Sequence, residues 1–242
     1  MFDVEKLKDD AHYYGEYGRK YLSNSDIGAL LTRPTEYGKP SEQTKPMLIG
    51  SYLHTHILEP EKVKNFEVID VASRNTKVYK EALANSTEKM ILLNSEAEEV
   101  KSLVKVIKGN LPFYEAIYNE SNQFEVPAVQ NIHGELWKGK ADVVCENMLI
   151  DLKTTSNMKD FKWSAKKYNY DSQCYIYQSL FGKPLVFYVI DKVSHQLGIF
   201  HASQDFLMRG KAKVEEAVEV YQKFFKEGSP EDIETYLHTE IL

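Results

Sequence analysis

A change in the spacing of apolar residues near position 120 limits most strongly what this chain can fold into. Before that point, residues 80–118 carry apolar side chains three and four positions apart, which predicts mainly helix. Leu103, Val106, Ile107 and Leu111 fall on one side of this segment. After that point, short apolar runs of strand length follow one another and are separated by turn residues. The chain is therefore expected to combine a helical first part with a sheet.

Three successive strands are predicted after residue 120, with the sequences "QFEVPAVQ", "LWKGKADVVCE" and "NMLIDLKTT". The connection "NIHGE" and a tight turn at Glu146–Asn147 join them. A helix over about 158–181 follows and is ended by Gly182 and Pro184. Two more strands, "PLVFYVID" and "QLGIFHAS", and an amphipathic helix over about 205–226 complete the order.

This order predicts an α/β fold in which a mixed sheet is flanked by helices and preceded by a helical N-terminal region. We expect a single domain over residues 1–242. Its parts are 1–120, which is mainly helical, 121–204, which holds the strands and the helix between them, and 205–242, the C-terminal helix and tail. Within the first part, "PMLIGSYLHTHILEP" has helical spacing and a stop at Pro60.

Composition favours an intracellular, cytoplasmic protein. No apolar run approaches the roughly 18 residues that span a bilayer, so no membrane contact is expected. The first residues, "MFDVEKLKDD", are charged and lack the apolar core of a signal peptide. Cys145 and Cys174 are the only two cysteines, which is too few for a disulfide framework or an iron–sulfur cluster.

The net charge of −6 argues at first against a nucleic acid as partner. The charge is unevenly distributed, however. Residues 205–242 hold five Lys/Arg and nine Asp/Glu, whereas residues 126–170 hold seven lysines and five acidic residues. Two of those five, Asp142 and Asp151, would be neutralised by a bound metal. The acidic total therefore weakens a nucleic-acid interpretation without excluding it.

The stretch "GKADVVCENMLIDLKTTSN" places Asp142 one hairpin away from Asp151 and Lys153. Residues two apart on a strand point to the same face, so Asp151 and Lys153 lie side by side. This predicts either a salt bridge on the surface or a metal site. Two converging carboxylates suit Mg²⁺ or Mn²⁺, and a lysine beside them can polarise water and stabilise charge on a phosphate. Metal-assisted phosphodiester hydrolysis fits this pattern.

Two further features bear on such a site. His54, on the predicted helix after Gly50, can complete a divalent-metal site as a neutral imidazole, whereas His56 is interpreted as a core residue. On the helix over 158–181, five polar or aromatic residues recur every three or four positions and are expected to share a face. They are Lys162, Lys166, Asn169, Gln173 and Tyr177. This is either a solvated face or a set of donors for a phosphate backbone with an aromatic for a base.

Four short motifs occur in a fixed order along the chain. They are Gly50–His54–Glu59–Pro60, Lys138–Lys140–Asp142, "IDLKTT" at 150–155, and Gln173–Tyr177. Together they resemble the RecB-like group of PD-(D/E)xK nucleases, and most closely the RecE (exodeoxyribonuclease VIII) type of phages and prophages. "YLSNSDIGALLTRPTEY" and "SRNTKVYKEAL" extend the similarity, which spans nearly the whole chain. It implies the restriction-endonuclease-like core with a mixed sheet.

The resemblance implies a role for each matched residue. Asp142 and Asp151 would be the central metal ligands, with His54 and the Leu152 carbonyl as further ligands, and Lys153 would orient the attacking water. Gln173 and Tyr177 would shape the active site, and Lys138, Lys140, Lys162 and Lys166 would contact DNA. Glu125 is a weaker match to an acid of related nucleases. Ala141 departs from the pattern by replacing a proline, and lysines stand at 138 and 140 where arginines are frequent.

The implied function is a Mg²⁺-dependent 5′→3′ exodeoxyribonuclease, with Mn²⁺ able to substitute. It would degrade one strand from the ends of linear double-stranded DNA and leave 3′ overhangs for phage-type recombination. The implied partners are a RecT-type annealing protein and further copies of the chain in a ring. Such a ring can hold lysines inward around DNA while the acidic C-terminal helix faces outward or a neighbouring subunit.

Two alternatives stay open. The same fold and motif serve endonucleases and single-strand nucleases, because fold and chemistry do not fix the substrate. A non-catalytic DNA-binding relative is also considered, although the acids, the lysine and the histidine are all present together. Arg33 and Arg74 are candidates for binding a 5′-phosphate, and ordinary surface roles are favoured for both.

Overall fold

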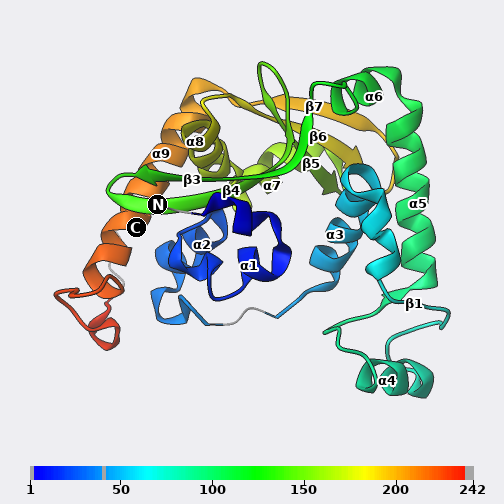
Figure 1. Cartoon of the computed structure of the whole chain (residues 1–242), viewed down its shortest axis with the longest axis horizontal. Coiled ribbons are helices and arrows are strands. Elements are labelled where there is room, and N and C mark those ends of the chain that lie inside the picture. The colour runs from blue at the N-terminus through cyan, green and yellow to red at the C-terminus, as the bar shows by residue number, and fades with distance from the viewer. Residues whose placement is uncertain (1–2, 40–41, 238–242) are drawn as a thin grey trace.

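The computed structural model describes residues 3–39 and 42–237, and its centre is a five-stranded mixed sheet with the order β3-β4-β5-β6-β7 (Figure 1). The strands are β3 (Gln123–Ile132), β4 (Glu135–Val144), β5 (Leu149–Thr155), β6 (Leu185–Asp191) and β7 (Leu197–His201). All neighbours are antiparallel except β5 and β6, which run parallel. The predicted α/β fold with a mixed sheet is confirmed.

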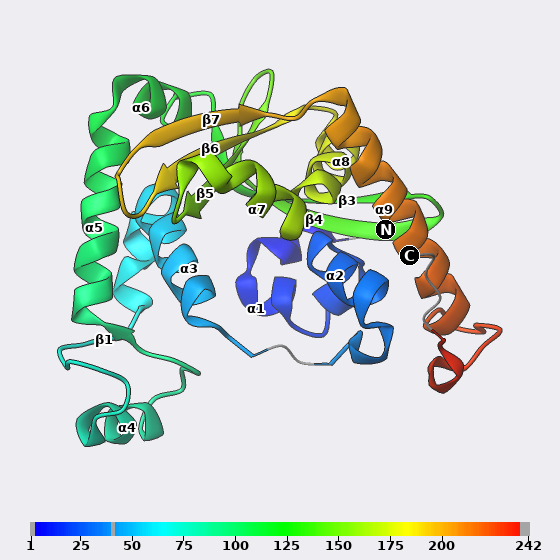
Figure 2. The same ribbon diagram turned by 180° about the vertical axis from the view of Figure 1, so that it is seen from behind.

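Side chains along β5 alternate between the two faces of the sheet, so its residues pack into two different layers. Ile150 and Leu152 pack into a core with α3 (Lys45–Leu58), α5 (Asn94–Gly109) and α6 (Leu111–Ile117). Leu149 instead packs with α7 (Phe161–Lys167) and α8 (Tyr170–Phe181) on the other face. In Figure 2, α7 lies in front of β5 and β6, and α9 (Gln204–Phe224) flanks the sheet next to α8. Asp151 and Lys153 share the parity of Leu149 and so point toward α7 and α8.

The N-terminal region lies against the β3–β4 hairpin (Figure 1). Leu22 pairs with Trp137 through hydrogen bonds from Leu22 N to Leu136 O (2.9 Å) and from Lys138 N to Leu22 O (2.8 Å). This pairing covers the part of β4 that extends beyond β5. The helices of the region are η1 (Val4–Lys8), α1 (Asp10–Tyr14), η2 (Gly18–Lys20), α2 (Asn24–Thr32) and η3 (Pro34–Glu36).

A small arm projects between α3 and α5, as Figure 1 shows around α4. It consists of η4 (Pro60–Asn65), β1 (Val68–Ile69), α4 (Lys77–Ala84) and β2 (Leu92–Leu93). The segment 80–118 is therefore mainly helical, as predicted, but in three helices. Leu111 is 64% exposed rather than packed with Leu103 and Ile107, because a new helix begins at Leu111 after Asn110 caps it.

The prediction of a single helix over 158–181 is wrong. The segment forms η5 (Met158–Asp160), α7 and α8, and α7 is separated from α8 at Asn169, which has a left-handed backbone (φ 56°). That conformation is held from outside the segment. Lys213 Nζ donates to Asn169 Oδ1 (2.7 Å), and Asn24 Nδ2 donates to the Asn169 carbonyl (3.2 Å). The chain ends with α9 and η6 (Ile233–Thr235), and among residues 3–39 and 42–237 no helix is long and apolar enough to cross a membrane.

The arm is anchored by a buried ion pair between Arg74 and Glu96. Both guanidinium nitrogens Nη1 and Nη2 lie 2.6 Å from the carboxylate, and Lys45 Nζ lies 3.0 Å from it. Although burial raises the pKa of Glu96, the hydrogen bonds from Arg74, Leu93 N and Lys45 lower it to about 2. Arg74 therefore forms an ion pair with Glu96. Arg33 likewise forms an ion pair with Glu36 (2.9 Å).

Glu96→Gln is expected to lower the free energy of unfolding by about 2 kcal/mol at pH 7, because Arg74, Lys45 and Leu93 N lose the buried carboxylate that accepts their hydrogen bonds. The depressed pKa makes the contribution of Glu96 complete above pH 4.5, its ordinary pKa, and removes it progressively toward pH 2. Denaturant unfolding of both proteins at pH 7 and pH 3 measures this. Glu98→Gln, on an exposed face of α5, is the control and should change stability by less than about 0.5 kcal/mol. A difference between Glu96→Gln and the parent that grows on acidification would contradict the account.

Candidate active site

Asp151 and Lys153 lie side by side on β5, as their spacing predicts. Lys153 Nζ is 2.5 Å from Asp151 Oδ2. Gln173, on α8, donates from Nε2 to Asp151 Oδ1 at 2.5 Å. Asp151 is 3% exposed, so this is a buried pair rather than a surface salt bridge. Its Oδ2 atom is buried and lies against the Lys153 ammonium group.

The side chain of Asp142, on β4, extends across the gap between β4 and β5 toward the backbone of β5. The two strands pair only at Val143–Ile150 and Val144–Leu149, and beyond these pairs they separate. Asp142 fills the opening, where its Oδ2 accepts a hydrogen bond from Leu152 N (2.8 Å). The early end of the hairpin thus allows the carboxylate of β4 to approach the backbone of β5.

His54 approaches Asp142 from α3. Its Nδ1 lies 3.4 Å from Asp142 Oδ2, and its Nε2 lies 2.8 Å from the Leu152 carbonyl oxygen. The imidazole therefore contacts both groups that flank the opening between the strands. His56, two residues on, instead packs edge-on against the Tyr52 ring (centroids 4.5 Å apart).

Glu125 also lies beside His54 and Asp142, and its backbone conformation is unusual. It lies opposite Asp142 in the β3–β4 register, between the pairs Phe124–Val143 and Val126–Ala141, but it has φ +49° and makes no ladder pair. A left-handed conformation is uncommon for glutamate and costs of order 1 kcal/mol. Ligand atoms of His54, Glu125 and Asp142 all lie within 4.8 Å of one another.

The charges of these groups shift one another's pKa values. Burial, together with the charge of Asp142, raises the pKa of Glu125 to about 8. Burial lowers the pKa of His54, but the charge of Asp142 and the hydrogen bond to it prevail and raise that pKa to about 9. Burial also opposes the charged form of Lys153, yet Asp151 raises its pKa, so its ammonium is charged near neutral pH. Burial and the charge of Asp142 raise the pKa of Asp151. The pKa of Asp142 itself is lowered, because the charge of His54 and its hydrogen bond outweigh burial.

These residues fit a divalent cation. The carboxylates of Asp142 and Glu125 repel each other, and burial together with the charge of Asp142 raises the pKa of Asp151, so added positive charge at this place is favourable. Ligand atoms of His54, Glu125 and Asp142 are already close enough to share one ion. The 2.8 Å contact between His54 Nε2 and the Leu152 carbonyl oxygen is a hydrogen bond that an ion would replace. His54, Glu125, Asp142, Asp151 and the Leu152 carbonyl are the groups that could hold the ion.

Solvent reaches this cluster from two sides. A cavity of about 550 Å³ is lined by His54, Leu152 and Lys153 together with Tyr168 and Tyr170. A second cavity of about 570 Å³ is lined by Glu125 and Glu59. The candidate cation site therefore lies between two openings, which leaves room for an extended substrate on either side.

Tyr170 belongs to the site but was not predicted from the sequence. Its ring centroid lies 4.9 Å from Lys153 Nζ, and the ring lines the 550 Å³ cavity. Tyr170 precedes Gln173 by three residues on α8, so helical spacing from Gln173 is the signal that could have indicated it.

Tyr177 and the two lysines of β4 are part of the scaffold around the site. Tyr177 OH donates to the Lys140 carbonyl (3.0 Å). Lys138 is 6% exposed, donates to the Tyr13 carbonyl and lies 4.2 Å from the Tyr13 ring centroid. Lys140 Nζ pairs with Asp10 at 2.5 Å. In this structure neither ammonium group is free for the phosphate contact that the sequence predicts, because the N-terminal segment covers both.

Lys162 and Lys166 lie away from the metal-binding groups. The break at Asn169 places them on α7, so they do not share a face with Gln173 and Tyr177, and that prediction is wrong. Both lysines are exposed and line a separate pocket.

Glu125→Gln is expected to weaken Mn²⁺ or Mg²⁺ binding by at least about 10-fold, because one anionic ligand is lost. In EDTA its melting temperature should stay equal or rise, since the repulsion of Asp142 is removed. Isothermal titration with each cation and thermal melts in EDTA measure these effects. Glu59→Gln, on the wall of the same cavity, is the control. Unchanged cation affinity in Glu125→Gln would exclude Glu125 from the site.

Comparisons with known proteins identify the family of the chain and a protein that shares its fold. The sequence profile of a PDDEXK-like domain of unknown function (DUF3799) matches residues 20–235. A crystal structure from Eubacterium rectale, described as a "putative exonuclease", superposes with a TM-score of 0.66 at 18% identity and covers 97% of this chain and 96% of that one. A crystal structure of SSO0001, at 16% identity and covering 80% of this chain and 84% of that one, has a TM-score of only 0.34. A search of the curated proteins finds no match. The profile and the shared fold support a nuclease of the PD-(D/E)xK superfamily, whose members generally use divalent metals.

Proposed function

The chain belongs to the family of PDDEXK-like domains DUF3799, and we propose that it is a Mg²⁺-dependent exodeoxyribonuclease that degrades one strand of linear double-stranded DNA. The observation that carries the proposal is the arrangement around Leu152. Its N–H holds Asp142, its carbonyl contacts His54, and the side chains on either side of it, Asp151 and Lys153, form a buried pair.

The residues divide the chemistry between them. The cation would be held by Asp142, Asp151, His54, Glu125 and the Leu152 carbonyl, and Mn²⁺ would be able to substitute. A bound divalent cation polarises a phosphoryl oxygen and lowers the pKa of water. Lys153 is charged near neutral pH, so it donates hydrogen bonds to the water and to the phosphate oxygens rather than accepting a proton. Gln173 fixes the Asp151 carboxylate through its hydrogen bond to Oδ1.

The finer assignments of the proposal come from the resemblance to RecE-type enzymes. Digestion proceeds 5′→3′ and leaves 3′ overhangs for recombination in a bacterial cytoplasm, with the gene carried by a phage or prophage. A RecT-type annealing protein receives the overhang, and copies of the chain form a ring around the DNA. Light scattering of the purified protein tests the ring.

The polarity is tested with linear duplex DNA labelled at either its 5′ or its 3′ ends, with closed circular plasmid alongside. We expect early release of the 5′ label in Mg²⁺ and no cutting of the circle. Early release of the 3′ label reverses the polarity. Cutting of the closed circle, or faster digestion of single strands than of duplex, assigns the activity to an endonuclease or a single-strand nuclease instead.

A further inference from the structure

Helix α7 forms a ridge between two cavities. Its buried residues, Phe161 and Ala165, anchor it to the sheet. At 100° per residue, Ser164 and Tyr168 fall on one flank, and both line the cavity that contains Lys153. Lys162 and Lys166 fall on the other flank and line the second pocket. Trp163 and Lys167 therefore lie on the crest, away from the sheet.

The ridge as a whole combines exposed aromatic rings with lysines that make no ion pair within the described part of the chain. Trp163 is 58% exposed and Tyr168 is 56% exposed. The ammonium groups of Lys162 and Lys166 lie 5.2 and 5.0 Å from the Trp163 ring centroid, and that of Lys167 lies 5.5 Å from the Tyr168 centroid. None of these three lysines makes an ion pair with any residue in 3–39 or 42–237.

Exposed aromatic rings and unpaired lysines at one place are energetically unfavourable, and a bound ligand removes this penalty. A large aromatic residue on the surface loses the stabilisation of burial, and unpaired lysines in a chain of net charge −6 concentrate positive charge at one place. A ligand with flat apolar faces joined by regularly spaced anions satisfies both features. Single-stranded DNA has this chemistry, since its bases stack on aromatic rings while its phosphates pair with cations.

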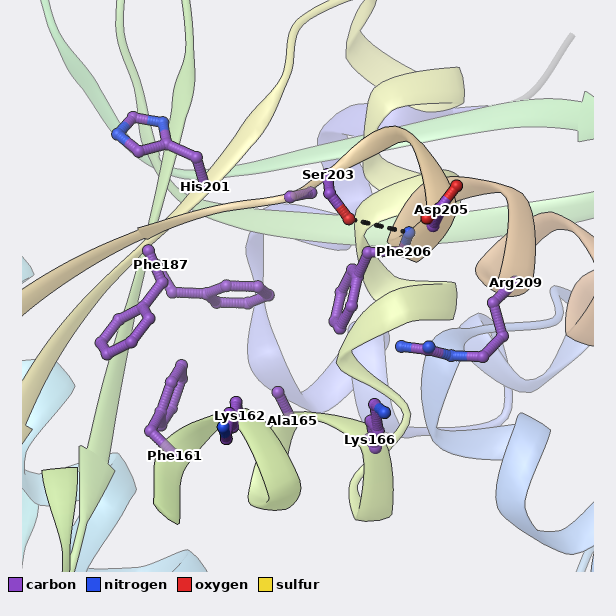
Figure 3. A pocket seen from close by; sticks show the side chains of 12 residues that line it. Phe161, Lys162, Ala165, Lys166, Phe187, His201, Ser203, Asp205, Phe206 and Arg209 are labelled. Atoms are coloured by element: carbon purple, nitrogen blue, oxygen red, sulfur yellow. Dashed lines mark hydrogen bonds between the residues drawn. The ribbon is translucent and has the colours of Figure 1, made fainter. Parts of the chain in front are cut away.

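The pocket beyond the ridge continues the same pattern. It has a volume of about 330 Å³ and lies between α7 and the first turn of α9. Figure 3 shows the rings of Phe161 and Phe187 on one side and the side chains of Lys166 and Arg209 on the other, with Phe206 between them. The Arg209 guanidinium lies 5.0 Å from the Phe206 ring centroid. Arg209 pairs through Nε with the buried Asp171 (2.6 Å), but its Nη2 atom is buried without a partner among the described residues. The pocket thus offers apolar walls with cationic donors at one side.

We propose that a single strand of DNA crosses α7 between the cavity beside Lys153 and the pocket beneath α9. One base stacks on Trp163, the phosphates contact Lys162, Lys166 and Lys167, and the next nucleotide enters the phenylalanine-lined pocket under Arg209. The choice of DNA rests on the proposed nuclease function. The path explains why α7 carries three lysines and no acidic residue although it contributes no ligand to the cation site.

Tryptophan fluorescence tests the path directly, because the chain has two tryptophans and Trp137 is fully buried. In EDTA, which prevents hydrolysis, oligo(dT) should quench the Trp163 emission. The affinity of a fluorescein-labelled oligo(dT), measured by anisotropy, should fall about 10-fold in Trp163→Ala and be largely kept in Trp163→Phe. Lys166→Ala should lower the slope of log affinity against log salt concentration by about 0.7. Tyr114→Ala, which removes an exposed ring from α6 (46% exposed), is the control and should bind as the parent does.

Three outcomes would overturn the proposal: affinity of Trp163→Ala within twofold of the parent, an equal loss in Tyr114→Ala, or equal quenching by a blunt duplex of the same length. The nuclease function is read separately, from metal-dependent hydrolysis of bis(p-nitrophenyl) phosphate, which is too small to need the ridge. Parent and Tyr114→Ala should hydrolyse it equally. If neither hydrolyses it while oligo(dT) still binds through Trp163, the nuclease function is wrong and the single-strand path stands.

Discussion

Lys153→Ala is expected to slow the hydrolysis of linear duplex DNA by at least about 100-fold while divalent-cation binding persists. The variant removes a charged donor positioned against the reacting phosphate, and the loss of one such donor typically costs this much in rate. Cation binding should be kept or strengthened, because Asp151 Oδ2 loses the ammonium group that lies 2.5 Å away and competes with the ion. Initial rates in Mg²⁺ and calorimetric titration with Mn²⁺ measure the two effects.

Two matched variants make the Lys153 result specific. Lys192→Ala removes another lysine from the wall of the same cavity and should change the rate by no more than a few-fold, because the described ion pairs of Asp142 and Asp151 are with His54 and Lys153 and not with Lys192. Asp151→Asn should abolish both hydrolysis and tight cation binding. If Lys153→Ala keeps more than about a third of the activity, or loses cation binding together with activity, Lys153 does not act as assigned.

Gly210→Ala is expected to give the largest loss of stability. Helices α8 and α9 touch backbone to backbone at Gly210, where an added Cβ would lie 2.0 Å from the Asp171 carbonyl oxygen and 2.9 Å from Ser172 N. The helices must therefore separate. Separation also weakens the pairs that Arg209 (2.6 Å) and Lys213 (3.0 Å) make with the fully buried Asp171.

Overpacking and a damaged buried ion pair together cost about 3 kcal/mol or more. For a chain of this size we expect the melting temperature to fall by about 6–12 °C, measured by circular dichroism. Gly109→Ala is the matched control, because a Cβ there meets no atom within 4 Å and alanine favours a helix. A melting temperature for Gly210→Ala within about 2 °C of the parent would show that the α8–α9 contact is looser than described.

The sheet could be predicted from the sequence because its signal is local. Each strand from β3 to β7 is a short apolar run bounded by turn residues, and the turn at Glu146–Asn147 fixes the hairpin that leads to Asp151. The spacing of Asp151 and Lys153 likewise predicts their common face. The hydrogen bond between Gln173 and Asp151 was not predicted, since it joins residues 22 positions apart. The resemblance implied only that Gln173 shapes the active site.

What the sequence did not predict depends on distant contacts. Hydrogen bonds from Lys213 and Asn24 hold the break between α7 and α8 at Asn169. The regular helical spacing of residues across Asn169 therefore did not indicate the break. The burial of Lys138 and Lys140 is due to Tyr13 and Asp10, about 130 residues earlier. These lysines therefore resemble exposed phosphate ligands in the sequence and are covered in the structure.

Glu125 illustrates the same limit within the site. Its position on the strand before Asp142 was predicted, but its left-handed backbone was not, because nothing in "QFEVPAVQ" favours it. The carboxylate joins His54 and Asp142 through this conformation. A pattern of residue types thus indicated an acid near the site, whereas the geometry that makes it a candidate ligand is a property of the folded chain.

The central claim is that Asp142, Asp151 and Lys153 form a cation-dependent phosphodiesterase site. The measurement that tests it most directly is the release of acid-soluble nucleotides from linear duplex DNA by the parent and Asp142→Asn proteins, purified side by side, in Mg²⁺ and in EDTA. We predict release by the parent in Mg²⁺, none in EDTA, and none by Asp142→Asn in either condition. Release that persists in EDTA, or that is equal in the two proteins, would contradict the claim.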